Sequence, residues 1–232
     1  MVITMEIDNR LIKEYLKNVY FVTGTAYAGK SSVCKTLSEK CSLHHCEENY
    51  NLGNFIELSD IDKHLNLNYF NTMGSWDNFV NRSKEEYESW INGVKEEIYE
   101  FEILELISLS KNKKVIVDTN IPLRVLREIS DYSRVLVMVS TQEIAMKYFF
   151  DREDAEKQFL FKVINESKTP KQTLKNFQEC IAYINRPERI EEYKRSKFYV
   201  IERKNYDEDI EDKIKQAETF FGFDKNEIEP KK

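Results

Sequence analysis

The chain has 232 residues, of which 41% are hydrophobic and 33% are charged, and its net charge is −6. Only 6 glycines and 4 prolines are present, which excludes collagen-like and linker-rich proteins and disfavours a turn-rich all-β sandwich. The acidic balance disfavours nucleic acid as a partner, because such binding depends on clustered Lys and Arg. The length predicts a single domain over residues 1–232.

The first half of the chain alternates short apolar runs with amphipathic stretches. Apolar residues recur at steps of three and four in the amphipathic stretches, as in helices that bury one face. The predicted helices cover residues 8–17, 30–41 and 83–111, and the predicted strands cover 19–23 and 54–58. Residues 66–82 have no clear pattern. Gly93 falls inside the longest predicted helix, where a helix break or kink is expected because glycine is a poor helix former.

The second half continues the same alternation. The predicted strands cover residues 115–117, 135–139 and 198–201, and the predicted helices cover 122–129, a stretch from 142, 170–184, 187–195 and 207–221. Continuous apolar runs between helices are typical of parallel strands that are buried on both faces. The sequence therefore predicts an α/β fold, with three layers (α/β/α) and a parallel five-stranded sheet.

The cysteines and the lengths of the apolar runs indicate in which cellular compartment the protein is expected. The four cysteines have no metal-ligand spacing, which favours free thiols in a reducing compartment. No stretch approaches 18 consecutive apolar residues, so no membrane association is expected. We expect a cytoplasmic protein whose oligomeric state the sequence leaves open.

One segment carries a specific chemical signal. Gly24-Thr-Ala-Tyr-Ala-Gly29-Lys30-Ser31 matches G-x-x-x-x-G-K-[ST] and lies between a predicted strand and a predicted helix. Backbone N–H groups in such a loop point at phosphate oxygens, with the lysine on the β- and γ-phosphates and the hydroxyl on Mg²⁺. We therefore expect ATP and Mg²⁺ as cofactors. The expected nucleotide-binding residues here are Gly24, Thr25, Ala26, Tyr27, Ala28, Gly29, Lys30, Ser31 and Ser32. The alternative is a glycine turn with an exposed lysine.

The chain resembles P-loop kinases of the small-molecule and nucleotide kinase group, which includes shikimate-kinase-like, zeta-toxin-like and cytidylate-kinase-like proteins. The resemblance covers most of residues 18–205 and rests chiefly on the glycine-lysine motif just described. Neither an N-K-x-D motif nor an L-S-G-G-Q-like segment is present, which disfavours GTPases and transporter ATPases. The resemblance implies the P-loop NTPase architecture, with 63–112 as a helical substrate-binding segment and 150–171 as a lid.

Three acidic residues follow predicted strands, where the resemblance places functional groups. In the kinases that the chain resembles, an acidic residue after the second strand lies beside the substrate hydroxyl. Asp60 and Asp62 occupy the corresponding place in this sequence. The alternative is a helix N-cap by Ser59 or Asp60. The strand that ends in Asp118 resembles the Asp-x-Asn segment of zeta-toxin-like kinases, so Asp118 is expected to reach Mg²⁺ through water together with Ser31. The alternative is a turn before Pro122.

The resemblance also implies roles for two arginines. Lids of such kinases carry arginines that fold over the transferred phosphate, a role that falls to Arg152, although the usual second arginine is missing. A surface ion pair with Glu153 or Asp154 is the alternative. Arg186 lies in an Arg-Pro segment that resembles one stacking on adenine, and a helix that begins with Pro187 is the alternative.

Together these observations predict an ATP-dependent, Mg²⁺-assisted phosphotransferase that acts on a small hydroxylated or nucleotide acceptor. Lys30, Asp60 or Asp62, and Arg152 are its expected catalytic residues. The alternative is a nucleotide-binding regulatory protein with slow or no turnover. The phosphotransferase and the regulatory protein differ in one structural feature. In the phosphotransferase, the segment after residue 60 is expected to form a pocket that faces the glycine-lysine loop. The aromatic residues of this segment can either stack on a nucleotide acceptor or belong to the hydrophobic core. They are Tyr69, Phe70, Trp76, Phe79 and Trp90.

Overall fold

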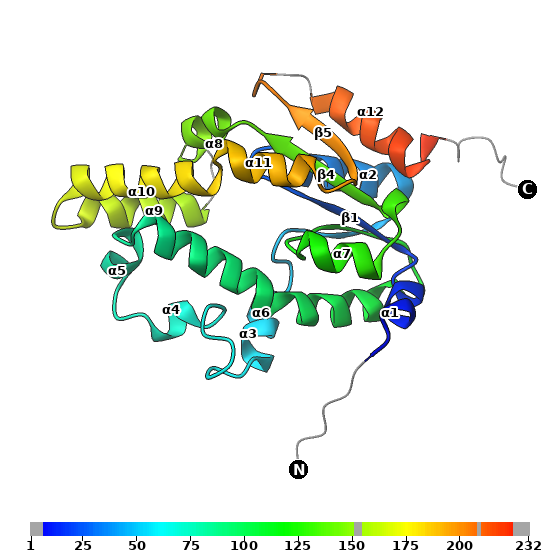
Figure 1. The fold of residues 1–232 in the computed structure, drawn as a ribbon, viewed down its shortest axis with the longest axis horizontal. Coiled ribbons are helices and arrows are strands. Elements are labelled where there is room, and N and C mark those ends of the chain that lie inside the picture. Colours follow the sequence, from blue (N-terminus) through cyan, green and yellow to red (C-terminus); the bar gives the residue numbers. More distant parts are fainter. Residues whose placement is uncertain (1–6, 151–154, 208–209, 225–232) are drawn as a thin grey trace, which may run out of the picture.

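A computed structural model describes residues 7–150, 155–207 and 210–224 of the chain. Its centre is a sheet of five parallel strands in the order β2-β3-β1-β4-β5 (Figure 1). The strands are β1 (Val19–Gly24), β2 (His44–Cys46), β3 (Val115–Asp118), β4 (Val135–Ser140) and β5 (Tyr199–Arg203). The α/β class with a parallel five-stranded sheet is thus confirmed.

Helices cover both faces of the sheet (Figure 1). Val19 and Phe21 of β1 face one core, and Tyr20 and Val22 face the other, because side chains alternate along a strand. The first core contains residues of α6 (Lys84–Ser110), α7 (Leu123–Ile129) and α11 (Pro187–Lys194), beside α1 (Asn9–Tyr15). The second contains residues of α2 (Lys30–Cys41) and α12 (Ile210–Phe221). This arrangement is compatible with three α/β/α layers.

The second strand is not where the sequence predicts it. Residues 54–58 belong to the helix α3 (Leu52–Leu58), and β2 is the three-residue His44–Cys46 at the sheet edge. Within the predicted run Phe55 is buried, whereas Leu58 is 66% exposed, so the run does not lie between two layers. Short apolar runs do not separate a strand from a helix, and His-His-Cys carries little strand signal. The predicted strand at 54–58 was therefore wrong.

A helical lobe extends from one end of the sheet (Figure 1). Its helices are α4 (Tyr69–Thr72), α5 (Trp76–Val80), the first half of α6, α8 (Gln142–Tyr148), α9 (Ala155–Glu166) and α10 (Pro170–Ile184). They share an aromatic core that includes Phe79, Tyr87 and Phe177. A short 3₁₀ helix, Tyr132–Arg134, precedes β4.

The long helix α6 joins the lobe to the sheet. It begins at a capping box in which Ser83 and Glu86 satisfy each other's backbone N–H groups, and it runs for 27 residues. The break expected at Gly93 is absent, and the helix continues through this residue. A Cβ at Gly93 would lie 2.3 Å from Nδ2 of Asn66, so the glycine allows the preceding loop to approach the helix closely.

Length and apolar character decide whether the helices can cross a membrane. In the ranges 7–150, 155–207 and 210–224, none of them combines the length and the apolar character that crossing a bilayer requires.

Candidate functional site

The ends of β1 and β3 form a crevice. These strands are neighbours, yet β1 leads into α2 on one face of the sheet and β3 leads into α7 on the other. Connections that leave adjacent strands toward opposite faces open a gap beyond their carboxyl ends, which is where ligands bind in open parallel sheets. The 24–31 loop and Asp118 both lie at this gap, because they end β1 and β3.

The 24–31 loop is held against the end of β4. Gly24 has φ 138°, and a Cβ there would lie 1.8 Å from the Met138 carbonyl oxygen. Thr25 N–H donates to that same oxygen at 2.9 Å. Ser140 N–H donates to Thr25 Oγ1 at 2.8 Å, and Ser140 Oγ donates to the Ala26 carbonyl at 2.6 Å. The Thr25 hydroxyl therefore serves to anchor the loop.

The loop then turns sharply into α2. Tyr27 and Gly29 have φ values of 61° and 96°, both in the left-handed region. Gly29 precedes the first residue of α2 and provides no side-chain cap, so the N–H groups of the first turn face outward without a side-chain acceptor at the cap. These N–H groups and the positive end of the helix dipole favour an anion at this position.

Lys30, Ser31 and Asp118 converge at the mouth of the crevice. Ser31 Oγ donates to Asp118 Oδ2 at 3.0 Å, and Lys30 Nζ lies 3.7 Å from Asp118 Oδ1 and 3.3 Å from the Thr25 carbonyl. Burial opposes the charge of Lys30, but the carboxylates of Asp118 and Glu48 raise its pKa. The ammonium group is therefore held in its charged form, aimed at the space that the loop encloses.

Ser31 and Asp118 fit a magnesium ion. Mg²⁺ takes oxygen ligands and keeps several waters, so one carboxylate and one hydroxyl suffice beside phosphate oxygens. Asp118 Oδ1 is buried and has no hydrogen-bond partner among the described residues. The described ranges hold no cluster of three or more His, Cys, Asp or Glu that could bind a metal by itself. Binding of Mg²⁺ here would thus depend on a phosphate ligand.

Glu48 is a site residue that the sequence analysis missed. It follows β2 by two residues and accepts a hydrogen bond from Asn120 Nδ2 at 2.9 Å. The charge of Lys30 is the main influence on Glu48 and holds the pKa of its carboxyl below the usual range. Glu48 therefore takes the place beyond the second strand that was expected for Asp60 or Asp62. A correct position for β2 would have identified it.

Asp60 and Asp62 lie elsewhere. They follow α3 rather than a strand, and both are exposed. Asp60 accepts from the Asp62 N–H at 3.0 Å and pairs with Lys63 at 3.1 Å, which makes a local turn. Neither residue lines a cavity beside the 24–31 loop. Their predicted place at the end of the second strand was wrong because that strand is formed by other residues.

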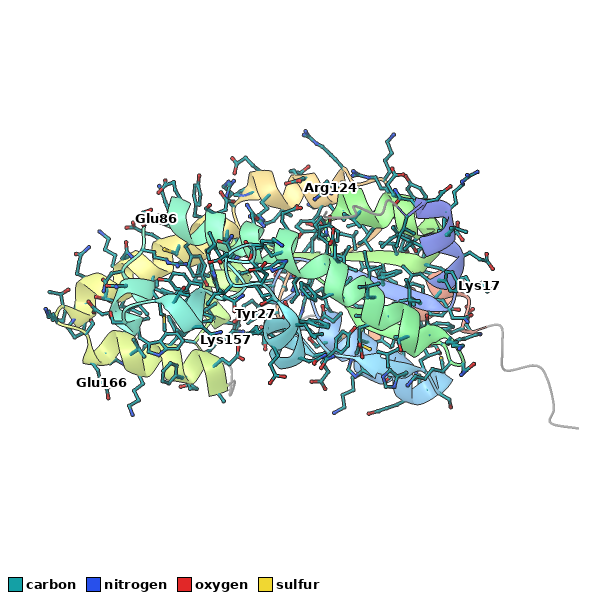
Figure 2. The ribbon with its side chains drawn as sticks, turned by 90° about the horizontal axis from the view of Figure 1, so that it is seen from below. Lys17, Tyr27, Glu86, Arg124, Lys157 and Glu166 are labelled. Atoms are coloured by element: carbon teal, nitrogen blue, oxygen red, sulfur yellow. The ribbon has the colours of Figure 1, made fainter. Side chains whose placement is uncertain are left out.

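Two cavities open on the loop. The smaller, of about 80 Å³, is lined by Ala26, Tyr27, Gly29, Lys30, Ser31, Ser32, Glu48 and Lys157. Lys157 belongs to α9 in the predicted lid, and its Nζ lies 5.0 Å from the ring centre of Tyr27 (Figure 2). The segment that was predicted to be a lid thus reaches the loop through a lysine. Arg152, the expected lid arginine, lies outside the described residues.

The larger cavity, of about 320 Å³, has walls from three parts of the molecule. The loop side consists of Gly24, Thr25, Ala26, Lys30, Glu48, Asn49 and Asn120. The α6 side consists of Tyr87, Trp90, Ile91, Val94, Lys95 and Ile98. The third wall consists of Ile184, Asn185, Arg189 and Tyr193 from α10, α11 and their connection. The segment expected to bind substrate therefore does face the loop across a cavity.

Arg186 does not lie at the 24–31 loop. It precedes Pro187 at the start of α11 and donates to Glu88 at 2.6 Å and to the Tyr183 carbonyl at 2.7 Å. Neither loop cavity is lined by it. Its position matches the helix-start interpretation and gives no support to stacking on adenine.

Another arginine contacts the loop instead. Arg203, at the end of β5, donates to the Tyr27 carbonyl at 3.3 Å and lies 4.5 Å from the ring centre of Tyr206. Tyr206 stacks on Tyr148 with ring centres 3.8 Å apart. This aromatic pair lies beside the loop because Tyr27 packs in the same cluster. No sequence motif marked these residues.

Comparison with known proteins does not assign the chain to a family. No protein-family model matches the chain, and no curated protein matches it either.

Proposed function

We propose that the protein is a P-loop kinase, an ATP- and Mg²⁺-dependent phosphotransferase that acts on a small acceptor in the 320 Å³ cavity. The observation that carries the proposal is the convergence of Lys30, Ser31 and Asp118 at the start of α2, in a crevice that opens on this cavity. A charged lysine, outward N–H groups and an oxygen pair for Mg²⁺ are the groups that phosphoryl transfer needs.

The reaction needs positioning and charge neutralisation more than covalent chemistry. An acceptor hydroxyl oxygen forms the new bond to the γ-phosphorus of ATP, the bond from that phosphorus to the β–γ bridging oxygen breaks, and ADP leaves. Lys30 and the loop N–H groups hold the phosphates. Ser31 and Asp118 would hold Mg²⁺, which would supply positive charge to the phosphate oxygens. Lys157 adds a further cation from the lid side.

Glu48 is the group proposed to receive the hydroxyl proton. It lines both cavities, so it faces the donor site and the acceptor site at once. Its lowered pKa keeps the carboxylate ionised at neutral pH, as a proton acceptor requires. Asn120 fixes its orientation through the 2.9 Å hydrogen bond.

The nucleotide base is proposed to lie on the Arg203 side of the loop. Tyr148 and Tyr206 present stacked rings there, and a guanidinium adjoins Tyr206. Flat aromatic and guanidinium surfaces stack on bases of any identity. The proposal leaves Arg186 without a role at the base.

The cavity also favours transfer over a purely regulatory role. A protein that only binds nucleotide has no need of a second cavity beside the phosphates. Here the side chains of α6 and α11 enclose one next to Lys30 and Glu48. The regulatory alternative predicts ATP binding without any phosphorylated product.

The test is ATP turnover by the full chain against a panel of hydroxylated, phosphorylated and nucleotide acceptors, with ATP binding measured by thermal shift. The Lys30→Met substitution is expected to lower transfer about 100-fold or more. Lys35→Met, on an exposed position of the same helix, is the control and should behave like the wild type. Full transfer by Lys30→Met would refute the proposal, as would an absence of ATP binding in the wild type.

A further inference from the structure

The cavity beside the loop adjoins a second chamber. This outer chamber has a volume of about 560 Å³ and lies between α6, α11 and the residues that follow β3. Both chambers are lined by Lys95, Asn120, Arg189 and Tyr193. These four side chains therefore form the boundary across which a bound molecule would extend. The inference drawn from this boundary rests on the proposed function and specifies its acceptor.

The boundary is positively charged. Lys95 Nζ lies 3.5 Å from the Tyr193 hydroxyl, and no described carboxylate comes within ion-pair distance of it. Burial disfavours ionisation of Tyr193, yet the charges of Lys95 and Arg189, together with Lys30, lower the pKa of this phenol. Tyr193 thus lies beside the cations of Lys95 and Arg189 at the place where the two chambers meet.

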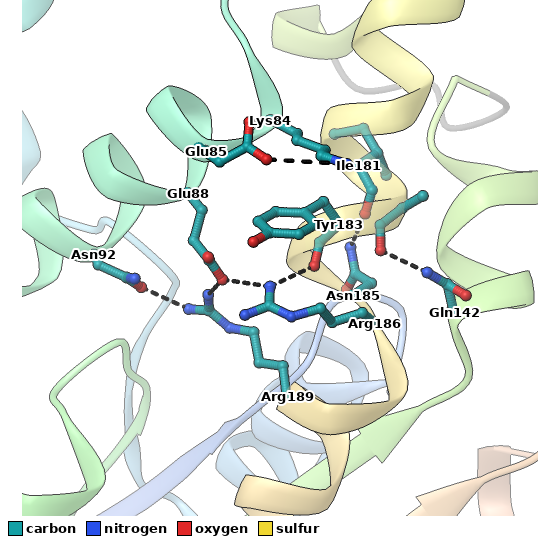
Figure 3. Close-up of polar contacts among 11 residues, drawn as sticks. Lys84, Glu85, Glu88, Asn92, Gln142, Ile181, Tyr183, Asn185, Arg186 and Arg189 are labelled. Carbon is teal, nitrogen blue, oxygen red and sulfur yellow. Dashed lines mark hydrogen bonds and ion pairs between the residues drawn. The ribbon is translucent and has the colours of Figure 1, made fainter.

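Arg189 is fixed in this position. Its Nη1 donates to Glu88 Oε1 at 2.8 Å, and its Nη2 donates to Asn92 Oδ1 at 2.8 Å (Figure 3). The same Glu88 oxygen accepts from Arg186 at 2.6 Å. Two guanidinium groups thus share one carboxylate, which leaves an excess of positive charge at the boundary, although Glu96, Glu188 and Glu192 line other parts of the outer chamber. The side chain of Arg189 is only 14% exposed, so little ordering remains to be done when an anion binds.

Apart from Lys95, the α6 wall of the inner chamber is apolar and aromatic. Tyr87, Trp90, Ile91, Val94 and Ile98 project from α6 at steps of three and four, which places them on one stripe of the helix. The Trp90 indole N–H donates to the Asn66 carbonyl at 3.1 Å, so the ring is held in one orientation. An apolar body and a charged group would therefore both be accommodated, in different parts of the same cleft.

We infer that the acceptor is a ring compound bearing a phosphate or carboxylate group. Its ring lies on the Trp90 wall, and its anionic group lies between Lys95 and Arg189. A hydroxyl of the same molecule then faces Glu48 and Lys30, since these line the remaining side of the inner chamber. Neutral acceptors would leave the boundary cations without a counter-charge and bind more weakly.

The first experiment uses Trp90 as the reporter. The chain has 2 tryptophans, and Trp76 lines neither chamber, so a Trp76→Phe background leaves Trp90 alone. Phenyl phosphate and benzoate are titrated beside the neutral phenol and benzamide. The anionic probes are expected to bind at least about tenfold more tightly than their neutral matches. The two anionic arms distinguish a phosphate site from a carboxylate site. Equal binding of neutral and anionic probes would overturn the inference.

The second experiment removes the boundary charge in the same background. Lys95→Met is expected to weaken the better anionic probe about tenfold and to leave phenol unchanged, and Lys95→Arg should restore much of the loss. Lys84→Met, at a half-exposed lysine of the same helix that lines neither chamber, is the control. Unchanged anion affinity in Lys95→Met would refute the inference.

Two further measurements distinguish a failure of the acceptor inference from a failure of the proposed function. Raising the salt concentration should weaken the anionic probes in the unsubstituted Trp76→Phe protein, which tests the charge without relying on the folding of a Lys95 variant. ATP binding is followed separately by thermal shift. Loss of ATP binding with intact probe binding would count against the proposed function. Intact ATP binding without anion preference would count against the acceptor class.

Discussion

The 24–31 loop and the cleft proposed for the acceptor, which comprises the inner and outer chambers, are built in opposite ways. The loop is a run of consecutive residues whose backbone N–H groups are proposed to bind phosphate, and the end of β4 fixes its shape through Thr25 and Ser140. The cleft is lined by side chains from α6, α11 and the segments after β2 and β3, which only the tertiary fold brings together. A contiguous motif is legible in a sequence, whereas a cleft of this kind is not.

The largest effect expected at the junction of these two regions concerns Glu48. Glu48→Gln keeps the hydrogen bond from Asn120 possible but removes the proton acceptor. We expect kcat to fall about 100-fold or more, with ATP affinity nearly unchanged. Rapid-quench or coupled assays of transfer, beside ATP binding, measure the two quantities.

Asp60→Asn and Asp62→Asn are the matched controls for Glu48→Gln. Both positions are exposed and lie away from the two loop cavities, so transfer should remain within about twofold of the wild type. A large loss in either control, with normal activity in Glu48→Gln, would return the acceptor-side acid to the place that the sequence indicates.

The contrast between Glu48 and Asp60 shows where sequence reasoning failed. The strands β1, β3, β4 and β5 and the helix α6 were predicted close to their observed positions, because each is a strongly patterned segment. The edge strand His44–Cys46 has neither length nor apolar character, and an amphipathic run in α3 mimicked it. One misplaced strand moved the expected acid by more than ten positions along the chain.

The charged residues of the cleft were even harder to predict from the sequence than the edge strand. Arg186 and Arg189 stand near a motif, but their role depends on Glu88 and Asn92 of α6, far away in the sequence. The turn-to-turn register of α6 decides which of its many Lys and Glu residues face α11. Composition and periodicity predict that α6 exists without predicting which of its charges meet another helix.

An effect on stability rather than on transfer is expected from a buried acid behind the junction. Glu102 lies on α6, with its side chain hydrogen-bonded to Thr119 next to Asp118. Burial raises the pKa of Glu102 to about 8, so its carboxyl is neutral in the folded protein below that pH. Because the folded-state pKa lies above the unfolded value, the free energy of unfolding contributed by this group is full at low pH and is lost as pH rises toward 8.

Glu102→Gln should remove this pH dependence. Between about pH 5 and pH 8 the stability of the variant relative to the wild type should rise by up to about 1.4 kcal/mol per pH unit. Urea unfolding at several pH values measures it. Glu100→Gln, an exposed position of the same helix, is the control and should give curves parallel to the wild type. Parallel curves for Glu102→Gln as well would show that its carboxyl is not held neutral by burial.

The smallest effects are expected from two glycines that lie outside the 24–31 loop. Gly53, in α3, has no atom near the position of an added Cβ, so Gly53→Ala should stabilise the protein by about 0.5–1 kcal/mol through helix propensity. At Gly93 the added Cβ would lie 2.4 Å from Cγ of Asn66. Asn66 must then move away from Glu97, to which its Nδ2 donates at 2.5 Å.

Gly93→Ala should therefore be destabilising by about 0.5–1 kcal/mol, since the lost contacts outweigh the gain in helix propensity. The Trp90 N–H bonds to the Asn66 carbonyl, so displacement of Asn66 should also shift the Trp90 fluorescence in a Trp76→Phe background. If the close approach of this loop shapes the cleft wall, chemical denaturation should show that Gly53→Ala raises the free energy of unfolding and that Gly93→Ala lowers it. Only Gly93→Ala should then change the Trp90 emission spectrum. Stabilisation by both alanines, with unchanged emission, would mean that the wall is set by the α6 side chains alone.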